Sequence, residues 1–168
     1  MLQRVTRKLQ LAIIFAALSA FMIALIPARE ALKGKTKEVV STLIALTFWI
    51  SLLLEQIFFW MANTGRKKIQ KKTALGKLVA KPRIGMINFG SSKEASICDI
   101  TLAVAVALTI VISLMRARAN WLTMGILAIL LLAFNLHCIL NGTTYRYIKA
   151  FHKMKKEREK RGNISKMH

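Results

Sequence analysis

The sequence predicts an all-α integral membrane protein, a four-helix bundle with a basic cytoplasmic loop and a basic C-terminal helix. Hydrophobic residues make up 55% of the 168 residues, and the mean hydropathy is +0.44, whereas soluble domains are about 45–50% apolar. The 27 Lys and Arg residues, against 7 Asp and Glu, lie almost entirely between or after apolar blocks, which is typical of a multi-pass membrane protein. The four apolar blocks are residues 11–26, 39–63, 97–115 and 121–140.

The length of each apolar block sets how it can cross a bilayer. About 20 apolar residues cover about 30 Å of hydrocarbon; the second and fourth blocks reach this length easily. The third reaches it if its helix begins one turn earlier, and the first is the shortest. We therefore expect a four-span transmembrane domain at residues 1–142 and a basic cytoplasmic tail at residues 143–168. The expected spans are about residues 10–27, 40–63, 95–116 and 120–141, with a cytoplasmic loop at residues 64–94.

The first apolar block has an alternative interpretation. Arg4, Arg7 and Lys8 followed by an apolar run are also typical of a secretory signal peptide. Cleavage would fall near the Ile-Pro-Ala of residues 26–28, which lacks the two small residues of an A-x-A site, and the run is slightly long for a signal core. We expect an uncleaved first helix that Pro27 ends.

Local sequence signals mark two further helix ends. Ser91 and Glu94 have the S-x-x-E spacing of a capping box, in which each side chain satisfies a free backbone N–H. The third helix is therefore expected to begin near Ser92. Asn141-Gly142 is a predicted break after the fourth span.

The distribution of positive charge predicts the orientation. The segment before the first span, the middle loop and the tail hold 21 Lys and Arg residues, whereas the other two connections hold 6. By the positive-inside rule both termini and the middle loop are cytoplasmic, in a multi-pass protein of the plasma membrane. Trp121 at the outer end and Trp60 and Tyr145 at the inner ends suit an aromatic belt, and Trp49 is expected to pack between helices.

Small and polar residues recur at i, i+4 spacing in the spans, which favours close helix packing in lipid. We expect each of these rows to face a neighbouring helix, with Leu, Ile and Phe toward lipid. The rows are Ala12, Ala16, Ala20 and Ala24; Thr47, Ser51 and Glu55; Thr101, Ala105, Thr109 and Ser113; and a weaker row of Gly125, Ala128, Asn135 and Cys138.

Polar residues in the cytoplasmic third of the spans are the main candidate site. Glu55 lies about 10 Å deep at 1.5 Å per residue, where a charge costs roughly 2.5–3.5 kcal/mol, so it should face the bundle. Asn135 and His137 lie about 200° apart around their helix, so both cannot point at Glu55. Asn135, on the small-residue face, is the expected partner, while His137 either pairs with Asp99 or reaches the headgroups. The predicted intramembrane polar layer comprises Glu55, Ser51, Asp99, Asn135 and His137.

Four interpretations of this layer compete. The first is a polar clasp that fixes helix register, and the second is a proton or cation site of a small transporter or channel. A metal site built from His137, Asp99 and Glu55 has no supporting spacing such as HExxH, so no metal and no cofactor are expected. An intramembrane hydrolase would use Cys138 or Ser51 with His137, but adjacent side chains on a helix do not face each other.

The loop and the tail form the second candidate site. Apolar residues interleave with the loop cations, so a short surface-lying helix ended by Pro82 is expected, with residues 83–89 folding back on the bundle. Either the charge only sets the topology, or it binds anionic lipid or an acidic partner. The candidate binding residues are Lys67, Lys68, Lys71, Lys72, Lys153, Lys155, Lys156 and Arg158.

The sequence leads to a ranked functional hypothesis. A non-enzymatic accessory or assembly factor that acts through a basic cytoplasmic face comes first, with anionic lipids and a protein partner or a second copy as partners. A proton- or cation-coupled transporter or channel centred on Glu55 is the alternative, and an intramembrane enzyme is third. No nucleic-acid module is visible, so the net charge of +20 is not interpreted as nucleic-acid binding. Cys98 and Cys138 are too few for a disulfide framework and are expected to be reduced packing residues.

Overall fold

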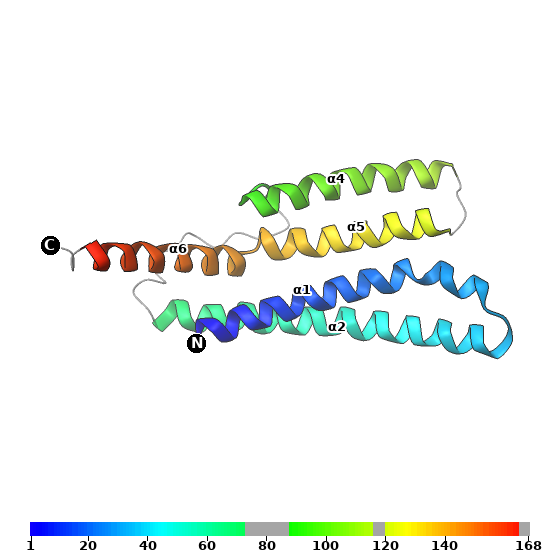
Figure 1. Cartoon of the computed structure of the whole chain (residues 1–168), viewed down its shortest axis with the longest axis horizontal. Helices are drawn as coiled ribbons and strands as arrows, with labels where there is room; N and C mark the ends of the chain where they lie inside the picture. Colours follow the sequence, from blue (N-terminus) through cyan, green and yellow to red (C-terminus); the bar gives the residue numbers. More distant parts are fainter. Residues whose placement is uncertain (73–87, 116–119, 165–168) are drawn as a thin grey trace.

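The computed structural model describes residues 1–72, 88–115 and 120–164, with the side chains of residues 71, 72, 155 and 158–164 left aside (Figure 1). Every regular element in these ranges is helical, and four of the helices are long and apolar enough to cross a membrane. In chain order the elements are α1 (Leu2–Ala24), the 3-10 helix η1 (Ile26–Ala31), α2 (Gly34–Lys72), α4 (Lys93–Leu114), α5 (Trp121–Leu140) and α6 (Thr143–Ile164).

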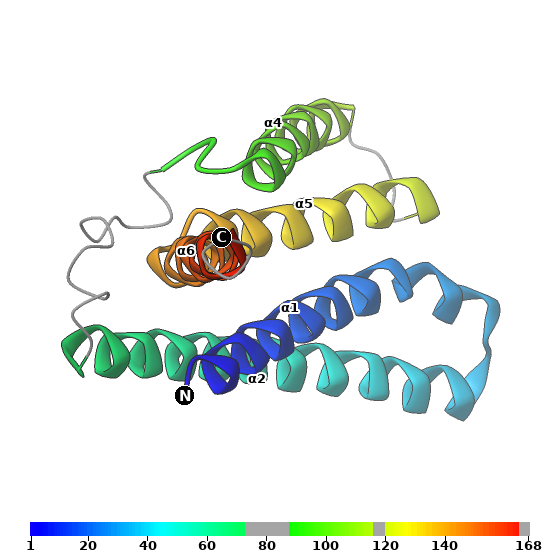
Figure 2. The same ribbon diagram turned by 60° about the vertical axis from the view of Figure 1, so that its left-hand side comes forward.

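The helices form two antiparallel hairpins, α1–α2 and α4–α5, which lie side by side (Figures 1 and 2). Helix α1 packs on both α2 and α5, while α4 packs on α5 at the edge. Helix α6 continues from α5 beyond the bundle (Figure 1). We call the end from which α6 projects the basic end (residues 1–9, 62–72, 88–99 and 135–164). The other is the opposite end (residues 20–50, 105–115 and 120–130).

The predicted stop at Pro27 takes a different form in the structure. Helix α1 ends at Ala24, and the Leu25 N–H donates to the Phe21 carbonyl at 3.1 Å. Pro27 then lies in the first turn of η1, where its missing N–H is not needed. Gly34, with a φ of +56°, begins α2; glycine adopts this left-handed conformation without a steric penalty.

Helix α2 extends well beyond the second apolar block, so the expectation of a separate surface-lying helix after Asn63 is wrong for residues 64–72. The helix is continuous to Lys72, because this stretch holds no proline and its one glycine, Gly65, faces the start of α1. A Cβ at Gly65 would lie 2.9 Å from Val5 Cγ2. The predicted helix end at Pro82 and most of the predicted fold-back at residues 83–89, namely residues 83–87, lie outside the described residues.

The start of α4 corrects the predicted cap by one residue. Ser92, and not Ser91, is the N-cap residue, since its side chain accepts a hydrogen bond from the Ala95 N–H at 3.2 Å. Ser91 instead contacts the end of α5, where its N–H donates to Asn141 Oδ1 at 3.2 Å. Asn141 is the C-cap residue of α5, so the chain breaks there between α5 and α6 as predicted.

The rows of small residues behave differently in the two hairpins. Ala12, Ala16 and Ala20 are buried in α1 between α2 and α5, as expected. On α4 the row is covered only in part: Ala105 is buried and Thr109 half-buried, whereas Thr101 and Ser113 are exposed. Their hydroxyls donate to backbone carbonyls one turn back, at 2.9 and 2.8 Å, so they need no neighbouring helix to satisfy them.

The prediction that Trp49 packs between helices is wrong. Trp49 is 61% exposed, and its ring makes an edge-to-face contact with Phe48, with the ring centroids 5.2 Å apart. The reason is that α2 packs mainly against α1, and much less against η1 and α6, so a face that turns away from α1 is left uncovered. Trp60 and Trp121 are also exposed, as an aromatic belt requires.

The main cluster of buried apolar side chains lies toward the basic end. Helices α1, α2, α5 and α6 all contribute to it, and α6 therefore packs onto the other three. Its buried members are Val5, Leu9, Ala12, Ala62, Ile69, Ile139, Tyr147 and Ile148.

Candidate functional site

Glu55 and Asn135 join α2 to α5 inside the bundle. Glu55 is 3% exposed and Asn135 is 6% exposed, and Asn135 Nδ2 donates to Glu55 Oε2 at 3.1 Å. This is the contact expected from the helical phase of the two residues. Ser51 is buried on the same face of α2, but its hydroxyl donates to the Thr47 carbonyl at 2.7 Å. Ser51 is therefore satisfied within its own helix, and the polar link between the helices is the Glu55–Asn135 pair.

Asp99 is the centre of a second polar cluster, which joins α4 to α5. Asp99 Oδ1 lies 2.6 Å from His137 Nδ1 and accepts a hydrogen bond from Asn141 Nδ2 at 2.9 Å. Its other oxygen, Oδ2, accepts from the Gly90 N–H at 2.6 Å. Because a carboxylate can only accept, the proton of the short contact to His137 belongs on Nδ1. The Phe89 ring covers the His137 ring, with centroids 4.8 Å apart.

The predicted single polar layer is therefore two separate clusters on different faces of α5. Asn135 faces α2, whereas His137 and Asn141, one turn apart, face α4. The sequence predicted that Asn135 and His137 belong to the polar site, but it marked Asn141 only as the break after the fourth span. The i, i+4 spacing of His137 and Asn141 puts them on one face, and this spacing is the signal that would have found the cluster.

A third polar contact region lies between α2 and α6 at the basic end. The Thr144 hydroxyl donates to Asn63 Oδ1, and Arg66 Nη1 donates to Gln70 Oε1 at 2.7 Å. Arg66 is 6% exposed and Tyr147 is 2% exposed. Arg66 Nε and the Tyr147 hydroxyl lack a hydrogen-bond partner among the described residues. The sequence predicted a loop position for Arg66, because the apolar block ends before Arg66, whereas the helix continues beyond it.

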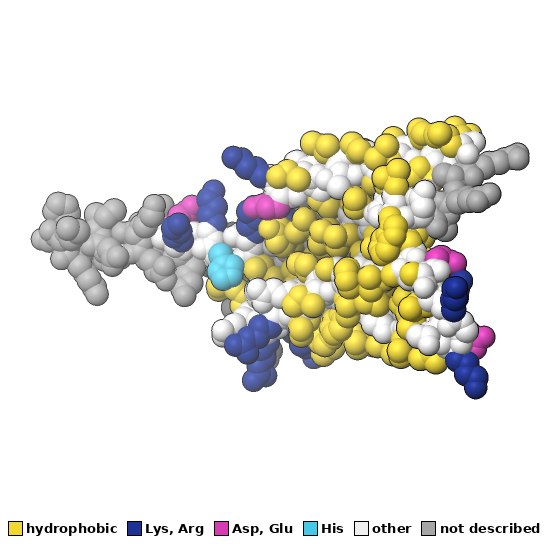
Figure 3. Space-filling model, turned by 45° about the vertical axis from the view of Figure 1, so that its right-hand side comes forward, with side chains coloured by type: hydrophobic (Ala, Val, Ile, Leu, Met, Phe, Trp, Pro, Cys, Tyr) yellow, Lys and Arg dark blue, Asp and Glu magenta, His cyan; other side chains and the backbone are white. Residues whose placement is uncertain are grey.

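Part of the predicted basic face is described. Lys67 and Lys68 on α2, and Lys153 and Lys156 on α6, are exposed. Figure 3 shows Lys and Arg side chains toward both ends of the molecule, with a mostly hydrophobic surface between them. The side chains of Lys71, Lys72, Lys155 and Arg158 lie outside the described part of the structure. Lys149 of α6 forms an exposed ion pair with Glu94 of α4, at 2.6 Å, and the hydrogen bond to that carboxylate raises the pKa of Lys149.

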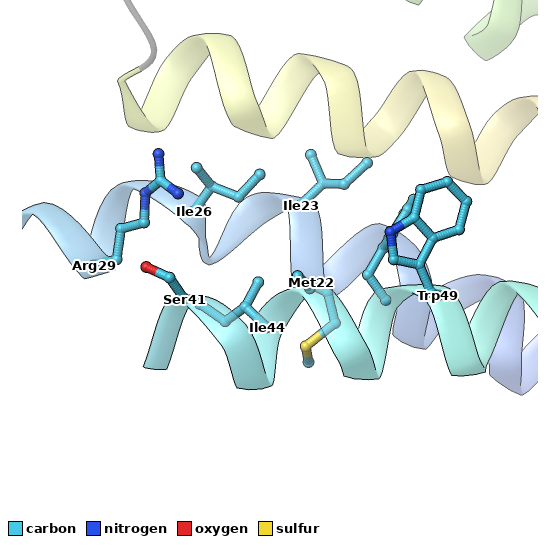
Figure 4. Close-up of a pocket in the computed structure, with 9 residues that line it drawn as sticks. Met22, Ile23, Ile26, Arg29, Ser41, Ile44 and Trp49 are labelled. Carbon is cyan, nitrogen blue, oxygen red and sulfur yellow. The ribbon is translucent and has the colours of Figure 1, made fainter. Parts of the chain in front are cut away.

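Two pockets lie between α1 and α2, one at each end of the bundle. The pocket at the opposite end has a volume of about 320 Å³ and is almost entirely apolar. Figure 4 shows Arg29 and Ser41 at one end of this pocket and Trp49 at the other, with isoleucine side chains between them. Arg29 Nε is paired with the Glu30 carboxylate at 3.3 Å. The pocket at the basic end has a volume of about 410 Å³ and is lined by cations from both helices.

The remaining chemistry-bearing side chains form no centre. Within residues 1–72, 88–115 and 120–164, no three His, Cys, Asp or Glu side chains are arranged to hold a metal ion. Cys98 and Cys138 are free thiols, and Cys98 Sγ donates to the Ala133 carbonyl at 3.2 Å. Comparisons of the chain with protein-family models, with curated proteins and with solved structures give no match.

Proposed function

We propose that the protein is a multi-pass plasma-membrane protein with both termini and the loop at residues 64–94 in the cytoplasm. It acts there as a non-enzymatic accessory or assembly factor through its basic end. The ratio of 21 to 6 Lys and Arg residues supports this orientation. The four long apolar helices support the membrane insertion on which the orientation depends.

One observation carries the proposal: the helices that bear the cations are packed into a core. Helix α6 buries Tyr147 and Ile148 against α1, α2 and α5, while Lys153 and Lys156 on the same helix are exposed. Topology alone requires positive charge near the membrane but does not require that its helices be packed. An ordered cationic surface favours recognition of an acidic partner or an anionic surface, because binding then loses less conformational entropy.

The transporter centred on Glu55 is the second candidate. An intramembrane carboxylate is a functional-site hypothesis by default, and Glu55 is one. Against it, Glu55 is almost fully buried and hydrogen-bonded to Asn135, and neither pocket between α1 and α2 includes it among its lining residues. This geometry favours a clasp over a pathway.

The intramembrane enzyme ranks third. The Asp99–His137 pair resembles the orienting half of a catalytic triad in its geometry. A nucleophile hydrogen-bonded to the histidine is the remaining requirement. The contacts of His137 Nδ1 are to Asp99 Oδ1 and Asn141 Nδ2, and neither atom belongs to a hydroxyl or a thiol.

Affinity capture tests the accessory role. The full-length protein, solubilised gently from its membrane, should bring down a stoichiometric partner or a second copy. Substitution of Lys67 and Lys68 by Gln should reduce that capture, whereas the same substitution of Lys33 and Lys35 at the opposite end should not. Equal capture by both variants would contradict a role for the basic end. Proton or cation flux in liposomes that contain the purified protein alone would instead favour the transporter.

Reporter fusions test the orientation separately. Fusions after Lys35 and after Arg161 should give opposite readouts, external for the first and cytoplasmic for the second. A cytoplasmic signal from both fusions would mean that the first or the second helix does not cross the membrane. The result does not depend on whether a partner exists.

A further inference from the structure

The pocket at the basic end is formed by two facing rows of side chains. Arg4 and Lys8 lie one turn apart on α1, and Trp60, Thr64 and Lys68 follow one another at i, i+4 spacing on α2. Residues four apart lie on the same face of a helix, so each row points into the space between the helices. This space is about 410 Å³.

The close approach of the two helices shapes this pocket. Gly65 meets Val5 so closely that an added Cβ would lie 2.9 Å from Val5 Cγ2. Val5 is buried and, with Met61, provides an apolar wall, while Arg4 and Lys68 are exposed and Lys8 is half-buried. The pocket thus has a polar part and an apolar part side by side.

The charge in the pocket is of one sign. Three cations line it, no carboxylate does, and among the described residues none of the three forms an ion pair. Like charges that converge in this way repel one another, and a bound anion would offset the repulsion. The pocket at the opposite end differs, since its one cation, Arg29, already has the Glu30 carboxylate as a partner.

The position of the pocket along the helices matches the level of lipid headgroups. Lys8 lies three residues before the first apolar block, and Trp60 lies three residues before the end of the second; tryptophan is enriched at the membrane interface. Lys68 lies eight residues beyond Trp60, which is about 12 Å along a helix at 1.5 Å per residue. The cationic part therefore extends outward from the hydrocarbon, and the apolar part extends toward it.

We infer that this pocket binds the phosphate headgroup of one anionic phospholipid. The guanidinium of Arg4 and the ammonium groups of Lys8 and Lys68 contact the phosphate oxygens, and the Thr64 hydroxyl donates a further hydrogen bond. Val5 and Met61 contact the glycerol and the first methylene groups. The inference rests on the proposed membrane insertion, but not on the accessory role or on which side is cytoplasmic.

Native mass spectrometry of the full-length protein in detergent tests this site. With phosphatidylglycerol added at low ratios, one lipid should remain bound, and phosphatidylcholine should be retained about tenfold less, because only the former has net negative charge. Substitution of Arg4 and Lys8 by Gln should lower retention of phosphatidylglycerol by about tenfold or more. The matched control replaces Arg7 and Lys93 by Gln, two exposed cations that do not line the pocket, and should retain the lipid as the unmodified protein does.

Three outcomes would overturn the inference. Equal retention of phosphatidylcholine would make the contact purely apolar, and equal loss in the control variant would make it a diffuse charge effect. Displacement of the lipid by millimolar inorganic phosphate would assign the site to a soluble phosphate. If the double variant fails to fold by circular dichroism, Lys68→Gln, on the other helix, gives the same readout. Failure to capture a protein partner would leave this result unchanged.

Discussion

The basic end and the opposite end of the bundle are built differently. At the basic end, one apolar cluster buries Tyr147, Ile69 and Val5, and polar side chains form hydrogen bonds between neighbouring helices. At the opposite end, large apolar side chains such as Leu43, Trp49 and Leu122 are exposed. The polar contact that holds the η1–α2 turn, Lys37 to Glu30 at 2.8 Å, is itself exposed.

The membrane insertion proposed above would account for this difference, because the two ends would then meet different solvents. In the hydrocarbon of a bilayer, an exposed leucine is solvated as well as a buried one, so helices need only a few close contacts to associate. Where the helices extend past the hydrocarbon, exposed apolar area costs about 25 cal/mol per Å², and they must form a core as soluble helices do. The basic end is thus where side-chain substitutions should change stability most.

The largest expected effect is the loss of Tyr147. Tyr147→Ala should lower the free energy of unfolding by about 3–5 kcal/mol, the range for removal of a buried aromatic side chain. Trp49→Ala, at the opposite end, removes a larger side chain that is 61% exposed and should change it by under about 1 kcal/mol. Unfolding by sodium dodecyl sulfate in mixed micelles measures both.

A second variant isolates the reason for that loss. The Tyr147 hydroxyl has no hydrogen-bond partner among the described residues, so Tyr147→Phe should leave stability unchanged or raise it slightly. A Phe variant as unstable as the Ala variant would show that the hydroxyl, and not the packing of the ring, holds α6 in place.

The next largest effect is expected at Asp99. Asp99→Ala removes the acceptor for His137 and Asn141, and should lower the free energy of unfolding by about 2–3 kcal/mol. Gly90 is exposed, so its N–H can bond to water, and its hydrogen exchange should become faster. Thr101→Ala, two residues along α4 with an exposed hydroxyl bonded within the helix, should change neither measurement. Unchanged exchange at Gly90 in the Asp99 variant would argue against the cluster.

How far the sequence predicted these regions depends on the physical signal. The Glu55–Asn135 contact could be predicted, because a carboxylate in lipid must face a partner and the helical phase fixes which residue it meets. The helical structure of the polar stretch that carries Arg66 could not be predicted, because hydropathy marks where an apolar block ends and not where a helix ends. Trp49 was misjudged since periodicity shows which face a residue occupies, but not whether a second helix covers that face.

Gly142, which follows α5, and Gly125, inside α5, should respond in opposite ways to replacement by alanine. A Cβ at Gly142 would lie 2.8 Å from the Cys138 carbonyl oxygen and 3.1 Å from that of Ile139. Backbone cannot move aside as a side chain can, so Gly142→Ala should destabilise the protein by about 1–3 kcal/mol and reorient α6. Gly125, inside α5 toward the opposite end, has open space at its Cβ, and Gly125→Ala should stabilise by about 0.5–1 kcal/mol. The same sign for both would contradict this account of the α5–α6 break.

At Glu55, between the two ends, only a small effect on stability is expected from the conservative substitution. Glu55→Gln keeps the shape of the side chain, and its amide oxygen can still accept from Asn135 Nδ2. If Glu55 acts as a clasp, Glu55→Gln should therefore change the free energy of unfolding by under about 1 kcal/mol and leave partner capture intact. Glu55→Leu leaves the buried Asn135 amide without its acceptor, and should lower the free energy of unfolding by about 1–3 kcal/mol.

Flux measurements on the same two variants separate the clasp from the transporter, because glutamine cannot exchange a proton. If Glu55 is a coupling site, purified protein in liposomes should carry protons, and Glu55→Gln should abolish that flux while the fold survives. If Glu55 is a clasp, neither the unmodified protein nor the Gln variant should carry them. Flux that persists in a folded Glu55→Gln variant would exclude Glu55 as the coupling site, since it would show transport that does not need the carboxylate.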